Sequence, residues 1–145
     1  MFQNCTSLTL PNGFTLPATA IAVGCYAGLF QDCQSLTLSD GFTLPATTLA
    51  VSCYINMFRG CTSLTLPNGF TLPATTLAVS CYDSMFNGCT SLNVMRTLMT
   101  DISAYNCLSN WLNGVAATGD FYCDQNLTIP TGVDGIPSGW TRHDI

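Results

Sequence analysis

The sequence predicts a repeat solenoid of short parallel strands and short helices, closed by a C-terminal cap. The chain copies itself every 28 residues: residues 29–56 match 57–84 at 20 of 28 positions, and residues 1–28 match 57–84 at 21. The columns of this repeat are apolar, because Phe30, Cys33 and Leu36 recur one unit later as Phe58, Cys61 and Leu64. One unit is too small to bury its own apolar face, whereas stacked units bury a continuous core.

Within one unit the pattern predicts two strands and one helix. Residues 63–66 and 70–72 alternate polar and apolar side chains, which is typical of strands, and Pro67-Asn68-Gly69 between them signals a turn. An apolar set then follows at helical spacing: Leu77, Cys81, Tyr82, Met85 and Phe86.

The repeat pattern divides the chain into two parts. Residues 1–92 hold three full units and the start of a fourth, and residues 93–145 are expected to form a degenerate repeat and the cap. In the second part, residues 103–115 resemble the repeat helix. Residues 121–123 are predicted to form a strand, and residues 128–145 are predicted to form loops. Met1 aligns with Met57, so the chain starts in phase with the repeat. Either the sequence is a fragment of a longer repeat protein, or its first unit meets another subunit or domain.

Composition excludes several function classes. Charged residues make up 8% of the chain, with three arginines, eight aspartates, one histidine and neither lysine nor glutamate. Without a basic face, nucleic acid is a poor partner. No apolar run is long enough for a membrane span, and no signal peptide is visible at the N-terminus.

Candidate chemistry is sparse. The nine cysteines lack the two-residue spacing of zinc or redox motifs, so they are interpreted as buried repeat residues, with disulfides or a metal site as the alternatives. His143 lies beside Asp144, but no nucleophile motif or oxyanion loop accompanies it. We therefore predict no enzyme activity: no catalytic residue, no cofactor and no metal.

Two segments, MFRGCTSLTLP (57–67) and CYDSMFNGCTSL (81–92), carry a family resemblance. Their aromatic residue, Gly-Cys-x-Ser-Leu step and strand ending near proline resemble the BspA-like leucine-rich repeat family. The amino-acid sequence of these segments is also similar to that of surface and phage-associated repeat proteins of gut bacteria. The resemblance implies a leucine-rich-repeat-like α/β solenoid and adhesion at a cell surface or virion, hence an extracellular location.

Two function hypotheses follow. In the first, the protein is a non-enzymatic adhesion module that recognises protein or glycan. Differences between repeats concentrate at one edge, which predicts a ligand surface containing Tyr54, Asn56, Arg59, Tyr82 and Asp83. In the second, copies assemble end to end into a fibre through the first unit, whose assembly face would contain Phe2, Leu8, Leu10 and Phe14.

Overall fold

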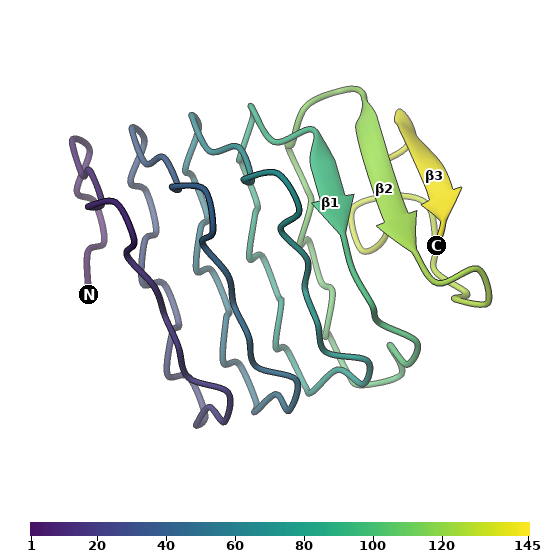
Figure 1. Cartoon of the computed structure of the whole chain (residues 1–145). Helices are drawn as coiled ribbons and strands as arrows, with labels where there is room; N and C mark the ends of the chain where they lie inside the picture. Colours follow the sequence, from purple (N-terminus) through teal and green to yellow (C-terminus); the bar gives the residue numbers. More distant parts are fainter.

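The computed structural model describes all 145 residues as a row of coils stacked side by side (Figure 1). Its only sheet lies at the C-terminal end of the row and consists of three parallel strands in the order β1-β2-β3: β1 (Val94–Arg96), β2 (Gly119–Cys123) and β3 (Trp140–Asp144). The structure contains no helix, so the predicted leucine-rich-repeat-like α/β fold with short helices is wrong. It also contains no helix that could cross a membrane.

Overlapping tight turns replace each predicted helix. In the second coil, the N–H of Cys53 donates to the carbonyl of Ala50, that of Ile55 to Ser52, and that of Met57 to Tyr54. These bonds reach back three residues rather than four and involve only every second residue. The same pattern recurs in the segments that we call turn ribbons: 22–33, 50–61, 78–89 and 104–113.

The remaining N–H groups of a turn ribbon bind the next coil. Tyr54 donates to the carbonyl of Cys81 at 3.1 Å, and Phe58 donates to that of Met85 at 2.9 Å. An α-helix would satisfy all of these groups internally and leave none to join the coils. The backbone hydrogen bonds of the turn ribbons therefore hold the stack together.

A left-handed backbone at every fourth residue makes the turn ribbon possible. Such a φ is found at Ser52, Asn56 and Gly60 in one coil, and at Ser80, Ser84 and Gly88 in the next. All of these positions hold glycine or a small polar residue, the types that tolerate a positive φ best. This local requirement overrides the helical spacing of the apolar side chains.

The predicted strands 63–66 and 70–72 also do not form, whereas the turn between them does. Phe70 N–H donates to the carbonyl of Pro67 at 3.0 Å, as the Pro-Asn-Gly pattern predicts. Proline has no N–H to give to a ladder, so Pro67 and Pro73 limit pairing in the third coil, although Ser39 holds the position of Pro67 in the second coil without a strand forming there. In the fourth repeat Met95 stands where Pro67 would recur, and there β1 forms.

The C-terminal residues follow their prediction in part. The strand predicted at 121–123 is confirmed by β2. The loop predicted over 128–145 is wrong from Trp140 onward, where β3 begins directly after Gly139. The N–H of Asn110 in the last turn ribbon donates to Asp134 Oδ1 at 2.7 Å, so the C-terminal segment covers this end of the stack.

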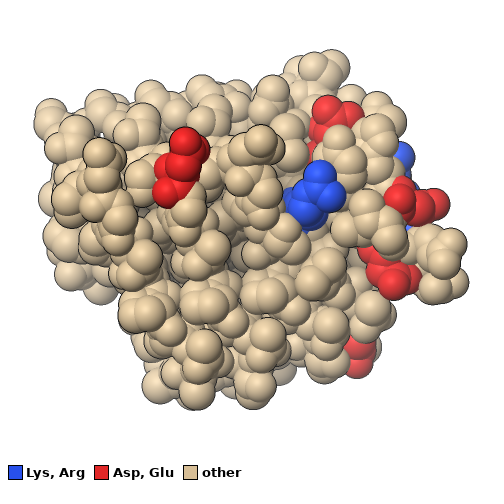
Figure 2. Space-filling model, in the orientation of Figure 1, with Lys and Arg blue, Asp and Glu red and all other residues tan.

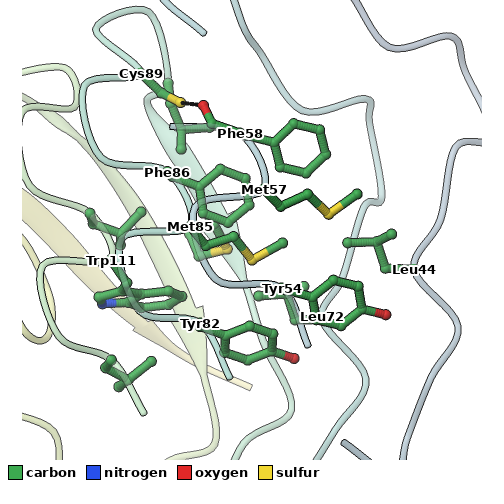
Figure 3. Close-up of a cluster of buried hydrophobic side chains, with 14 of the residues drawn as sticks. Leu44, Tyr54, Met57, Phe58, Leu72, Tyr82, Met85, Phe86, Cys89 and Trp111 are labelled. Atoms are coloured by element: carbon green, nitrogen blue, oxygen red, sulfur yellow. Dashed lines mark hydrogen bonds between the residues drawn. The ribbon is translucent and has the colours of Figure 1, made fainter. Parts of the chain in front are cut away.

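The core consists of like side chains stacked along the axis (Figure 3). Rings of Phe30, Phe58 and Phe86 lie nearly parallel, with centroids 5.6 and 5.5 Å apart. A second column joins Tyr26, Tyr54 and Tyr82 at 5.7 and 5.9 Å, and Trp111 extends it at 6.3 Å. Because every repeat places the same residue in the same column, one apolar cluster runs along the stack.

The cysteines form a third column that ties neighbouring coils together. Cys61 Sγ donates to the carbonyl of Phe30, and Cys89 Sγ to that of Phe58, each at 3.0 Å. All nine cysteines are free thiols, and seven of the nine are buried. The buried thiols of this column therefore act as hydrogen-bond donors between coils.

The turn-ribbon geometry predicts an effect of glycine at Ser52. Ser52→Gly should raise the free energy of unfolding by about 0.5 kcal/mol, because glycine adopts the positive φ without cost to the folded state. Ser35→Gly is the matched control: Ser35 is exposed and has an ordinary φ, so glycine there should lower stability. Chemical denaturation measures both. A loss of stability in Ser52→Gly would contradict the turn ribbon.

Thiol burial predicts selective labelling. Cys5 and Cys25 are exposed and should react with a disulfide reagent in the native protein, whereas the other thiols should react only after unfolding.

Burial raises the pKa of Cys53 to about 11 and that of Cys61 to about 12, from 9.0. Since these pKa values are higher in the folded state, stability should be intact below pH 9 and fall as the pH rises from about 9 to 12. Rapid native labelling of all the thiols would contradict this core.

The tyrosine column predicts a gain of stability on losing a hydroxyl. The hydroxyls of Tyr54 and Tyr82 are buried without a hydrogen-bond partner, and burial raises the pKa of both groups. Tyr82→Phe removes an unpaired polar atom from the core and should stabilise the fold by about 1 kcal/mol. Tyr105→Phe, at a 75% exposed position, should change little. Thermal unfolding distinguishes the two; a destabilised Tyr82→Phe would show that the hydroxyl is satisfied.

Candidate functional site

The structure does not assemble the predicted ligand surface. Tyr54 and Tyr82 are each only 1% exposed and belong to the core column, so they cannot form a surface pair with Arg59. Tyr82 also belongs to the apolar set at helical spacing, and its burial agrees with that set rather than with the predicted ligand surface. In a turn ribbon, the cysteine and the tyrosine that follows it both face the core.

The other members of that predicted surface have ordinary structural surroundings. Asn56 occupies one of the positive-φ positions, which accounts for the exchange among glycine, asparagine and serine at this repeat position. Asp83 is half-buried and accepts a hydrogen bond from Ser84 Oγ at 2.8 Å. Arg59 is exposed and forms no ion pair. The variation between repeats therefore reflects backbone geometry at least at Asn56.

The residues of the predicted assembly face lie together on the first coil. Phe2 is 37% exposed, and one face of its ring stacks on Phe30 with centroids 5.7 Å apart. Leu8, Leu10 and Phe14 are half-buried against the core. Assembly of copies through this face stays a prediction.

A different group of side chains converges on the outer face of the three-stranded sheet. We call it the sheet patch and define it by Arg96, Asp120, Tyr122 and His143. Parallel pairing aligns Arg96 with Tyr122, and Tyr122 with His143, so one row of side chains crosses all three strands. Alternation along each strand turns Met95 and Phe121 into the core and leaves this row outside.

The row is a continuous stack. The guanidinium of Arg96 lies over the Tyr122 ring, 4.0 Å from its centroid, as a cation–π contact. The His143 ring is also stacked on Tyr122, at 4.6 Å and an interplanar angle of 17°. His143 Nε2 lies 2.7 Å from Asp120 Oδ1, which fixes the imidazole orientation. These contacts hold polar side chains in place on a partly exposed surface.

A shallow groove adjoins the patch. It has a volume of about 220 Å³ and is lined by Val94 and Arg96 together with the turn segment 66–70 of the preceding coil. Arg96 has no carboxylate partner, so its guanidinium donors are available toward this groove. A planar anionic or hydrogen-bond-accepting group could pair with it there.

Charge distribution singles out the same end of the molecule. On the face shown in Figure 2, charged side chains gather where the C-terminal strands lie, and the coils toward the N-terminus are almost uncharged. Two of the three arginines and the only histidine belong to the strands: Arg96, Arg142 and His143. Their position outside the repeat was the signal in the sequence that could have indicated this site.

Arg142 has a structural role rather than a place in the patch. Its guanidinium donates to the carbonyls of Asp124, Gln125 and Leu127 and to Asp144 Oδ1. The hydrogen bond to Asp144 raises the pKa of Arg142. Arg142 thereby fastens the 124–127 loop beneath β3.

The patch holds a histidine–carboxylate pair, and no hydroxyl or thiol is hydrogen-bonded to it. The only side-chain partner of His143 is Asp120, although the sequence places His143 next to Asp144. No group of side chains in the structure has the composition of a metal site. The pair of His143 and Asp120 therefore has no third side chain in the arrangement of a Ser-His-Asp triad.

Comparisons with known proteins add no relative. No family model, curated protein or solved structure matches the chain. The resemblance to the BspA-like leucine-rich repeat family therefore stays a prediction.

Proposed function

We propose that this protein is a non-enzymatic recognition module that binds a protein or glycan ligand through the sheet patch, at the surface of a bacterium or virion. The observation that carries the proposal is the stack of Arg96, Tyr122 and His143 across three strands. Arginine and tyrosine are the residue types enriched where binding energy concentrates.

The scaffold supports recognition because it orders the patch before a ligand arrives. Strand pairing fixes the backbone of all three residues, and Asp120 fixes the imidazole, so little side-chain freedom remains to be lost on binding. The same rigidity would not by itself produce catalysis. The surface location is proposed from the family resemblance alone.

The free donors of Arg96 indicate the chemistry of the ligand. Its charge has no carboxylate partner within the protein, while Asp120 and His143 satisfy each other. A ligand carboxylate would complete the pairing of Arg96, and a carboxylate can be presented by an acidic glycan or an acidic peptide.

Binding to arrays of acidic and neutral glycans and peptides tests the proposal. The protein should bind acidic members, and Arg96→Gln should weaken that binding at least about tenfold, because it removes the charge and the stacked guanidinium. Arg59→Gln is the matched control, since Arg59 is exposed but has no aromatic partner.

The control separates recognition from general charge. Equal losses in Arg59→Gln and Arg96→Gln would indicate nonspecific attraction to a cation. If no array member binds, or if Arg96→Gln binds as the unchanged protein does, the sheet patch is not the ligand site.

A further inference from the structure

β3 is an edge strand whose outer side has no partner. It pairs with β2 only, in the order β1-β2-β3. The N–H of Ile145 donates to the carbonyl of Cys123 at 2.9 Å, so Ile145 faces β2. Backbone groups alternate sides along a strand, and therefore those of Arg142 and Asp144 point away from the sheet. Such an edge is a template for another strand.

We propose that this edge pairs with the same edge of a second copy, antiparallel about a two-fold axis, with Arg142 opposite Asp144 of the second copy. An antiparallel pair exchanges both backbone bonds only where outward-facing residues meet. Symmetric registers that satisfy this requirement are centred on Thr141, Arg142, His143 or Asp144. The register centred on Thr141 needs the N–H of Trp140, which already donates to the carbonyl of Pro137 at 2.9 Å. Charge selects among the other three.

The charges of β3 favour one register. A register centred on Arg142 sets two arginines opposite each other, and one centred on Asp144 sets two aspartates opposite each other; like charges in this position are unfavourable. The register centred on His143 instead places Arg142 of each copy opposite Asp144 of the other. Within each copy Arg142 Nε already donates to Asp144 Oδ1 at 2.8 Å, so this register sets two such ion pairs side by side with opposite charges facing each other. The edge is therefore self-complementary in hydrogen bonding and in charge, which a C2 interface requires.

Pairing in this register would join the sheets of the two copies. His143 would lie directly opposite His143 of the second copy as a non-hydrogen-bonded pair. The sheet patches of the two copies would then share one face of a continuous sheet, and the module would present two ligand sites side by side. This inference adds a partner to the proposed function but does not depend on ligand binding.

Sedimentation equilibrium of the unmodified protein tests the inference first. The measured mass should rise from 15.5 kDa toward twice that value as concentration increases. Asp144→Pro removes an N–H that points away from the sheet, and should weaken dimerisation about tenfold or more, because one bond is lost from each copy. Asp144→Ala is the control that keeps the N–H and should weaken it less.

Cross-linking tests the register independently. It also replaces the Asp144→Pro measurement if circular dichroism shows that this variant is unfolded. In a background of Cys5→Ser and Cys25→Ser, which removes the exposed thiols, His143→Cys should form a disulfide-linked dimer. Thr141→Cys is the matched control and should not, because its partner would be Ile145. A monomer at every concentration, a dimer that Asp144→Pro leaves unchanged, or cross-linking only through Thr141→Cys would overturn the proposal.

Discussion

The stack depends on how each turn ribbon divides its backbone hydrogen bonds. Every second N–H closes a turn within the coil, and the others donate to the next coil. The division requires a left-handed residue at every fourth position, which the repeat supplies with Gly, Ser, Asn and Asp. Once this backbone is fixed, the 28-residue period sets identical side chains above one another. The phenylalanine, tyrosine and cysteine columns are consequences of that backbone.

The C-terminal sheet is where the chain departs from this arrangement. β1 forms around Met95, and parallel pairing there replaces the isolated contacts between coils. Pairing in register then gathers side chains that lie far apart in sequence, so that Arg96, Tyr122 and His143 stack in one row. The repeats supply a rigid base, and the divergent segment supplies the polar chemistry. This arrangement is consistent with the proposal that the sheet patch binds a ligand.

The buried polar groups of the core differ in whether they have hydrogen-bond partners. The thiols of Cys33, Cys61 and Cys89 donate to carbonyls of the preceding coil. The hydroxyls of Tyr54 and Tyr82 have no hydrogen-bond partner. A phenylalanine would fill that column without an unpaired atom, so tyrosine is not required there for packing. Charge is scarce on the repeats and concentrated on β1–β3, where the edge strand carries alternating Arg142 and Asp144.

The amino-acid sequence was enough to predict the 28-residue period, the apolar columns, the Pro-Asn-Gly turn and the strand at 121–123. Each depends on local residue types or on their recurrence. The hydrogen bonds between coils show that the apolar residues from Cys81 to Phe86 lie in a turn ribbon. A helix and a turn ribbon are compatible with the same apolar spacing and differ in which carbonyls their N–H groups bind. Only the tertiary structure decided that Tyr54 is buried and that Arg96 meets Tyr122, since both depend on coil-to-coil register. Contacts between residues distant in sequence are set by that register, which no single segment encodes.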